Sequence, residues 1–193
     1  MKRSTKEEFL QLLEPVYPRL SRYSLAITRN QDEAKDLTSD TILAALEQFE
    51  SMQDKEHFAG FLFKVASRLH KRKRYRERFR IAYSQVVAEA LEDSAPKPDK
   101  AAEIAIVMTA LDKLPPKMRE TIVLFDIADL SLEEIHTIQG GTLSGVKSRL
   151  KRGRELVKKI LGINERSEGI NFRTIKSENI SPALAKQGEY YAL

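Results

Sequence analysis

Residues 91–100, with the sequence LEDSAPKPDK, limit the fold more than any other feature of this 193-residue chain. Proline lacks a backbone N–H and clashes with the preceding turn of a helix, so Pro96 and Pro98 exclude a helix through this segment. Three acidic residues, and no large apolar residue after Leu91, give the composition of an exposed connection. We therefore expect two domains, residues 5–90 and 102–162, joined by a flexible linker at 91–101, with a tail of unknown role at 163–193.

Both domains are expected to consist of helices alone. The chain has only 8 glycines and 7 prolines, and no stretch alternates between apolar and polar residues as a half-buried strand does. This composition predicts an all-α fold. The longest weakly polar run, residues 104–111, is less than half of the ~20 residues that cross a bilayer, and Glu7 and Glu8 precede any apolar stretch. We therefore expect a cytoplasmic protein with neither a signal peptide nor membrane insertion.

Side chains that support catalysis or metal binding are scarce. The sequence has no cysteine, and His57, His70 and His136 are too far apart to form a motif such as HExxH. Acids at positions 32, 33, 36 and 40 lie on one predicted helix without a convergent partner. We therefore expect no catalytic residues, no metal site and no cofactor.

The net charge of +5 conceals two strongly basic blocks. Residues 67–80 hold eight basic side chains and one acid, and residues 147–159 hold seven and one, so the blocks carry +7 and +6. Subtracting these from +5 leaves −8 on the rest of the chain. One basic block in each domain indicates two separate contacts with a polyanion, although a charged run can also be a solvated helix face.

The second domain carries the signals of a helix-turn-helix. Ser131 and Glu134 have the S-x-x-E spacing of a capping box, and Gly140 and Gly141 permit a tight turn after the short helix that follows. In residues 143–160 apolar positions recur at intervals of three and four, which predicts a longer, amphipathic second helix suited to a major groove. The alternative is a helical hairpin with a solvated face. The residues on or beside the outward face are Lys147, Ser148, Lys151, Arg152 and Arg154.

In the first domain, the helix predicted over residues 34–49 has an acidic stripe opposite its apolar arc. Asp36, Asp40 and Glu47 form the stripe, and Leu43 lies beside it. An isolated exposed leucine usually has no special role. The alternative interpretation is a protein interface in which Leu43 packs while the acids meet a basic partner.

The helix that begins near Phe58 has a basic stripe instead. Lys64, Ser67, Lys71 and Arg74 recur at helical spacing on its outer face. Phe63 and Tyr75 border the stripe, where aromatic rings can stack on unpaired bases, although most aromatic residues of helices belong to the core. This helix is therefore a candidate for binding a single strand.

Five segments resemble motifs of the extracytoplasmic-function (ECF) sigma factors, the small two-domain class of bacterial RNA polymerase sigma subunits. In the first domain, DEAKDLTSDT at 32–41 resembles the family's D-A-E-D-L-x-Q-D-T, and FAGFLFKVA at 58–66 resembles F-x-x-W-L-x-R-I-A. In the second domain, ALDKLPPKMR at 110–119 resembles A-L-x-x-L-P-P-x-x-R, while LSLEEI and VKSRL resemble L-S-x-E-E-I and V-K-S-R-L. The match covers about residues 5–162, in the family's order and spacing.

The resemblance implies a fold of sigma region 2 and region 4 domains and a sigma factor's function. Such a protein binds core RNA polymerase, recognises a −35 element as duplex and a −10 element as a separated strand, and is often held inactive by an anti-sigma factor. By the match, the core polymerase interface contains Asp36, Asp40 and Leu43. The implied −35 residues are Lys147, Ser148, Arg149, Lys151 and Arg152. The implied −10 residues are Phe58, Phe61, Lys64, Arg68, Lys71 and Arg74.

Three positions depart from the family's pattern. Phe61 replaces a tryptophan, which keeps an apolar ring but loses the indole N–H. Ser67 and Arg68 stand where the family has Arg-Asn, and GGTLSG at 140–145 replaces G-I-P-V-G-T. These changes bear on how each DNA element is read rather than on the fold.

Two other functions fit parts of this pattern. A stand-alone helix-turn-helix regulator would bind DNA without polymerase, but it gives no reason for the acidic stripe beside Leu43. A nucleic-acid enzyme such as a recombinase would need an activated nucleophile or a carboxylate metal cluster. We also hypothesise that acidic residues cover both basic blocks in the free chain.

Overall fold

The computed structural model describes residues 3–83 and 100–162, with side chains described for 5–77 and 106–162. Every regular element in these ranges is a helix, which confirms the predicted all-α class. Residues 91–99 of the expected linker and the tail at 163–193 lie outside the described residues. The elements are α1 (Arg3–Leu13), α2 (Tyr17–Thr28), α3 (Gln31–Phe49), α4 (Phe58–Tyr83), α5 (Lys100–Asp112), α6 (Pro116–Ile122), the π-helical turn η1 (Val123–Ile127), α7 (Leu132–Gln139) and α8 (Leu143–Ile160).

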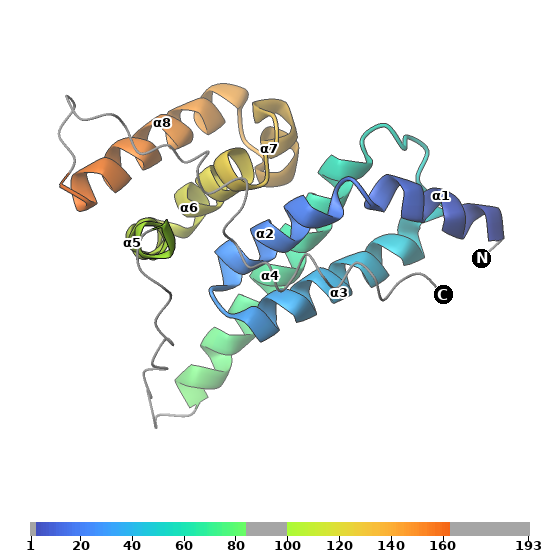
Figure 1. Ribbon diagram of the computed structural model, residues 1–193, viewed down its shortest axis with the longest axis horizontal. Coiled ribbons are helices and arrows are strands. Elements are labelled where there is room, and N and C mark those ends of the chain that lie inside the picture. The colour runs from blue at the N-terminus through green and yellow to red at the C-terminus, as the bar shows by residue number, and fades with distance from the viewer. Residues whose placement is uncertain (1–2, 84–99, 163–193) are drawn as a thin grey trace.

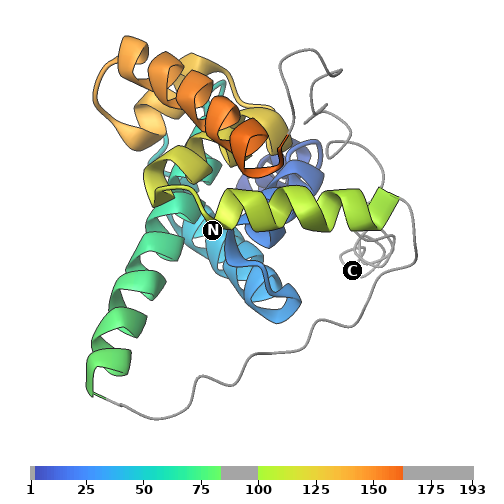
Figure 2. The same ribbon diagram turned by 90° about the vertical axis from the view of Figure 1, so that its left-hand side faces the viewer.

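Helices α1 to α4 form the N-terminal unit (Figure 1). Asn30 caps α3, because its side-chain oxygen accepts hydrogen bonds from two amides of the first turn at 2.9 and 3.0 Å. Phe9, Phe49 and Phe58 meet edge to face with ring centroids 5.2–5.8 Å apart, and they join α1, α3 and α4 around the loop at 50–57. The last turns of α4 project beyond the helices around them (Figure 2).

Helices α5 to α8 form the C-terminal unit, and α7 and α8 are the predicted helix-turn-helix. The capping box is present: Ser131 Oγ accepts from Glu134 N at 3.1 Å, and the Glu134 carboxylate accepts from Ser131 N at 2.8 Å. Gly140 ends α7 with a φ of +67°, which favours glycine. Thr142 then caps α8 by accepting from Gly145 N at 3.0 Å.

Helix α8 approaches α6 closely because position 153 has no side chain. A Cβ placed on Gly153 would lie 2.8 Å from both Met118 Cγ and Ile122 Cδ1. The amphipathic pattern of α8 is also confirmed, since Val146 and Val157 are buried on the same side. Helix α8 is therefore fixed to the rest of its unit by direct helix contact.

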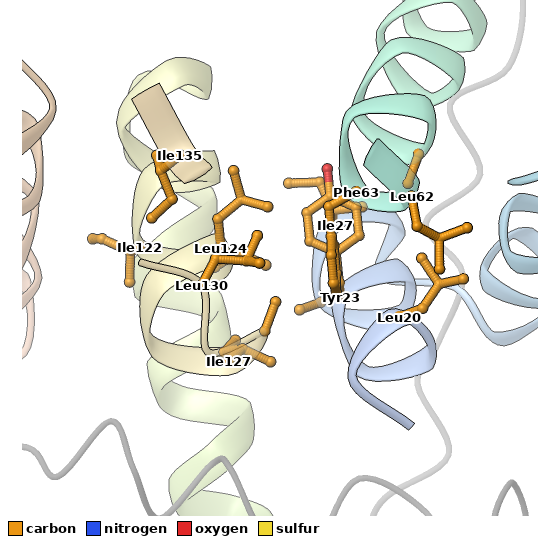
Figure 3. Packing of buried hydrophobic residues seen from close by; sticks show 14 of the residues in the cluster. Leu20, Tyr23, Ile27, Leu62, Phe63, Ile122, Leu124, Ile127, Leu130 and Ile135 are labelled. Atoms are coloured by element: carbon orange, nitrogen blue, oxygen red, sulfur yellow. The ribbon is translucent and has the colours of Figure 1, made fainter. Parts of the chain in front are cut away.

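The two units share one hydrophobic core. Helix α2 packs against η1, and α4 packs against α7. Figure 3 shows Tyr23, Ile27 and Phe63 of the N-terminal unit facing Leu124 and Ile127 of the C-terminal unit. The sequence break at 91–100 thus separates two units along the chain that nevertheless bury apolar surface against each other.

Candidate nucleic-acid and polymerase interface

The outward face of α8 presents most of the predicted −35 side chains to solvent. Lys147, Lys151 and Arg152 are exposed, while Ser148 is half-buried. The opposite face packs on the core, so these cations project from a helix whose orientation is fixed. The hypothesis that acidic residues cover both basic blocks is therefore wrong for this helix.

Two arginines of α8 are held against the protein. Arg149 is half-buried, its Nε and Nη2 atoms are buried without a hydrogen-bond partner, and its Nη1 lies near Gly145, one turn earlier. Arg154 was expected on or beside the outward face. Instead its guanidinium makes two bonds to the buried carboxylate of Asp126, one of them 3.1 Å long, and lies over the Phe125 ring at 5.1 Å. Arg154 therefore joins α8 to η1 and is not displayed for DNA.

The predicted −10 cations lie along the exposed face of α4. Lys64, Lys71 and Arg74 of the predicted stripe are exposed, and so is Arg68. The prediction that Ser67 also lies on the outer face is wrong: Ser67 is 2% exposed, because Glu120 of α6 packs against it and accepts its hydrogen bond. Tyr75 is 64% exposed at the end of the described side chains. This surface has the charge and the aromatic ring that single-strand binding uses.

The phenylalanines of this region are more buried than the sequence suggested. Phe63 has no exposed surface and packs edge to face on Tyr23 at 5.5 Å, so the interpretation of Phe63 as a stacking platform is wrong. Phe58 is 2% exposed within the aromatic cluster at the loop, and Phe61 is half-buried. Phe58 thus supports the loop at 50–57 from the side of the hydrophobic core and does not itself reach the surface.

The acidic stripe of α3 is exposed as predicted. Asp36 and Asp40 face solvent, and Leu43 beside them is 58% exposed. The acids border a groove whose other wall is the basic side of α4, with Arg72 and Arg76. An exposed leucine next to carboxylates at a groove is the surface expected for an interface with a basic protein partner.

A buried carboxylate links α4 to the other unit, which sequence reasoning missed. Glu120 of α6 is 4% exposed. Its carboxylate accepts hydrogen bonds from Ser67 Oγ at 2.5 Å and from Gln139 Nε2 at 3.0 Å, and it pairs with Lys71 Nζ at 3.0 Å. Lys71 Nζ also donates to Ser67 Oγ at 2.9 Å. One predicted −10 cation is therefore already held by the C-terminal unit.

Two side chains at this contact, His70 and Tyr23, have shifted pKa values. Burial, together with the positive charges of Arg74 and Arg119, lowers the pKa of His70 to about 4. Burial raises the pKa of the Tyr23 hydroxyl, and the Glu120 carboxylate raises it as well. His70 is therefore neutral near pH 7 and adds no charge of its own to the basic surface.

Neither a metal cluster nor a membrane span was found in the described part of the chain. Within it, no three His, Asp or Glu side chains are grouped so as to hold a metal ion. Among the same residues, no helix combines the length and apolar character needed to cross a bilayer.

Comparison with known proteins identifies the two units. The Sigma-70 region 2 family model matches residues 12–80, and the Sigma-70, region 4 model matches residues 104–157. The ECF RNA polymerase sigma factor EcfG of Rhodopseudomonas palustris is 30% identical over 149 residues, which cover 76% of this chain and 81% of that protein. The chain belongs to the ECF sigma factor family.

Other relatives agree with this assignment. The ECF sigma factor SigE of Mycolicibacterium smegmatis is 33% identical over 153 residues, which cover 74% of this chain and 57% of SigE. The solved structure of the sigma factor RpoE with the anti-sigma factor NepR from Bartonella quintana superposes with a TM-score of 0.66 at 24% identity, covering 82% of this chain and 99% of that one. CnrH in complex with the cytosolic domain of CnrY gives a TM-score of 0.60 at 23% identity, covering 82% and 90%.

The family assignment decides between the functions that the sequence left open. An ECF sigma factor binds core RNA polymerase and promoter DNA and directs promoter-specific initiation of transcription. The matched regions place α4 within sigma region 2 and α8 within sigma region 4. The stand-alone regulator and the recombinase are both inconsistent with this assignment.

Proposed function

We propose that this sigma factor reads a duplex −35 element with the outward face of α8 and a separated −10 strand with the exposed stripe of α4. The observation that carries the proposal is where the basic side chains lie in the two sigma regions. Each matched sigma region contains one long helix whose exposed side chains are basic and whose opposite face is buried. Each basic block then serves one promoter element.

On α8, the exposed ends of Lys147, Lys151 and Arg152 suit phosphates and guanine edges of a major groove, with Ser148 beside them. Arg149 would have to leave its position beside Gly145 to join them. Its two buried, unbonded nitrogens, Nε and Nη2, would then gain partners.

On α4, the side chains of Lys64, Arg68 and Arg74 are exposed and would bind phosphates of the non-template strand. Extruding a base costs a few kcal/mol, and stacking and phosphate contacts would offset this cost. Phe61 is half-buried at the start of the helix, next to the loop that would hold the extruded bases. Phe58 would act indirectly, by holding that loop on the aromatic cluster.

Core RNA polymerase would dock on the exposed side of α3, where Asp36, Asp40 and Leu43 lie. The nucleotide chemistry would belong to the polymerase, so this chain would contribute no catalytic residue and act in the cytoplasm. An anti-sigma factor is a further proposed partner, because RpoE, which shares this fold, was captured with the anti-sigma factor NepR. The functional domains are proposed to extend over 5–90 and 102–162.

A titration into bacterial core RNA polymerase, followed by native gel shift, tests the docking surface. Asp36→Lys with Asp40→Lys is expected to weaken binding at least tenfold, because two carboxylates that face a basic partner become cations. Glu14→Lys with Glu155→Lys is the matched control: both residues are exposed, and the change in net charge is the same.

The control variant is expected to bind core polymerase as the parent chain does. Equal loss in both variants would show that net charge, not the α3 surface, governs binding. Absence of binding by the parent chain, together with a shift of DNA alone, would overturn the proposed function and favour a stand-alone regulator.

A further inference from the structure

A cavity of about 520 Å³ lies where α4 faces α6. Four cations line it: Lys71 and Arg74 come from α4, and Lys117 and Arg119 come from α6. Small-molecule sites in proteins usually have volumes of ~300 to 1,000 Å³, so this cavity is large enough for a ligand of that kind. Because Lys71, Arg74 and Lys117 are exposed, a ligand in solution can reach these side chains.

The lining of this cavity carries more positive than negative charge. Its two acids, Asp112 and Glu120, each pair with one of the four cations, at 2.9 and 3.0 Å. Asp112 is also shared with Arg29, at 3.2 Å. The other two cations, Arg74 and Lys117, make no ion pair with any acid in the part of the chain that the structure describes. Two positive charges of the lining are therefore left for an anion.

His70 shows the effect of this charge. It is half-buried and lines the cavity, and its pKa is lowered to about 4 because burial and the positive charges of Arg74 and Arg119 disfavour the imidazolium. Glu120 acts in the opposite direction but does not outweigh them. An environment that disfavours a further positive charge favours a negatively charged ligand.

The cations gather at one place instead of following a line. Lys71 and Arg74 lie one turn apart on α4, and Lys117 and Arg119 approach from a second helix. A nucleic-acid strand spreads its charge, with one phosphate per nucleotide. A polyphosphate group places several charges on neighbouring phosphorus atoms. The cavity therefore suits a polyphosphate better than a strand.

An aromatic ring lies beside these cations. Tyr75 lines the same cavity and is 64% exposed. Aromatic side chains stack on nucleobases of any sequence, because every base has a π-face. A ring next to a group of cations thus matches both parts of a nucleotide, the base and the phosphates.

We propose that this cavity binds a nucleoside polyphosphate, with the phosphates on Arg74 and Lys117 and the base on Tyr75. The site itself is independent of the proposed function. Its consequence rests on the proposed function, which assigns Lys71 and Arg74 to the −10 surface. A bound nucleotide then competes with the separated −10 strand for these two side chains.

Isothermal titration calorimetry of the full chain with ATP and with GTP tests the site, in magnesium-free buffer so that no metal neutralises the phosphates. At least one of the two is expected to bind with one molecule per chain. Arg74→Ala with Lys117→Ala is expected to weaken this binding at least tenfold, because both charge-assisted contacts to phosphate are lost. Both side chains are exposed, so the variant should keep its fold, which circular dichroism checks.

The matched control is Lys6→Ala with Lys159→Ala. It removes the same charge from exposed positions on α1 and α8, outside the cavity. It is expected to bind the nucleotide within about twofold of the parent chain, because only the overall potential changes.

Inorganic triphosphate separates the two parts of the proposed site. Tyr75→Ala is expected to weaken nucleotide binding several-fold and to leave triphosphate binding unchanged, whereas Tyr75→Phe keeps the ring and should retain both. Nuclear magnetic resonance gives a local readout: a bound polyanion is expected to raise the pKa of His70 above about 4, with the signal assigned by its loss in His70→Asn.

Three outcomes overturn the proposal. Absence of saturable nucleotide binding, or equal losses in the cavity variant and its control, overturns the site. Equal binding of triphosphate and nucleotide, with no effect of Tyr75→Ala, overturns the assignment to a nucleotide. Binding of a random strand of about 20 bases that depends on Arg74 and Lys117, while neither ATP nor GTP binds, assigns the cavity to nucleic acid instead.

The competition and the proposed function are tested apart from the site. Saturating nucleotide is expected to weaken binding of the same random strand several-fold, and unchanged strand binding overturns the competition. Failure of the chain to bind core polymerase overturns the proposed function while nucleotide binding still supports the site. Failure to bind nucleotides leaves the binding of core polymerase, and with it the proposed function, unaffected.

Discussion

The two basic helices differ in what their cations contact. On α8, Lys147, Lys151 and Arg152 face solvent, and the ion pair of Arg154 with Asp126 stays within its own unit. On α4, Lys71 is paired with Glu120 of the other unit. Both helices carry a similar excess of positive charge, but the ion pair of Lys71 joins α4 to the other unit, whereas that of Arg154 does not leave the C-terminal unit.

The proposed −35 surface on α8 is therefore already accessible to solvent, whereas on the proposed −10 surface of α4 Lys71 is bound to Glu120. Lys147, Lys151 and Arg152 project from a helix that is fixed by packing at Gly153, so under the proposed function a duplex would meet these three cations without rearrangement. On α4, DNA bound as proposed would compete with a carboxylate that already bonds to Lys71 and Ser67. We therefore expect substitutions on α8 to act on DNA affinity directly, and substitutions near the α4 contact to act also through the packing between the two units.

The largest effect is expected from removing two cations of α8. Lys147→Ala with Arg152→Ala is predicted to weaken holoenzyme binding to a selected promoter about 100-fold, because a lost phosphate or base contact costs about 1–3 kcal/mol. The salt dependence of binding is measured as the slope of log K against log salt concentration. If both residues bind the DNA backbone, this slope should become shallower by about 2, since each lost phosphate contact reduces it by about 1. Promoters are first selected from random duplexes with the parent holoenzyme.

The control for this experiment lies on the same helix. Lys158→Ala with Lys159→Ala removes the same charge from the last turn of α8, away from the proposed groove contact. It is expected to reduce affinity for DNA only a few-fold, because it weakens the overall positive potential of the protein without removing a direct contact. Equal losses in the two variants would show that α8 contributes charge but no localised contact, and would contradict the proposed −35 surface.

A pair of glycines, one in each basic helix, tests how the two helices are held. At Gly153 a Cβ would lie 2.8 Å from side chains of α6, whereas at Gly60 the nearest atom, Cγ of Glu134, would be 3.7 Å away. Gly153→Val is predicted to destabilise the protein by ~2 to 3 kcal/mol through overpacking. Gly60→Ala is expected to be neutral or to stabilise by up to about 1 kcal/mol through helix propensity.

Urea denaturation followed by circular dichroism measures both glycine variants. A comparable loss of stability at both positions would mean that α4 is packed against α7 as tightly as α8 is against α6. A stable Gly153→Val variant would show that the ends of Met118 and Ile122 move aside, and that the fixed orientation of α8 has another source.

Most of the fold was predictable because its signals are local. The capping box at Ser131, the turn at Gly140 and the apolar spacing of residues 143–160 each act within a few residues, and all three are present in the structure. The exposure of Asp36 and Leu43 likewise followed from helical geometry alone. Local periodicity determines which face of a helix is apolar, and therefore which residues are displayed.

The contact between units was not predictable from such signals. Glu120 meets Ser67 across 53 residues and Arg19 meets Ala128 across 109, so no spacing rule connects them. Phe63 was misassigned for the same reason: its position at the margin of the basic stripe is correct on the helix, but α2 covers it. Arg154 looked available on its own helix until η1 supplied Asp126.

The smallest predicted effect concerns acid stability at the α4 contact. The folded pKa of His70 is about 4, below the ~6.5 of an unfolded histidine, so the unfolded state binds more protons between these values. The free energy of unfolding should therefore fall as pH drops from 6.5 to 4, and His70→Asn should reduce that slope. Urea midpoints at half-unit pH intervals measure it, with His57→Asn, an exposed histidine bonded to Asp54, as the control that retains His70. An unchanged slope in His70→Asn would mean that neither burial nor the positive charges of Arg74 and Arg119 oppose protonation of His70, which would contradict its half-buried position between these side chains.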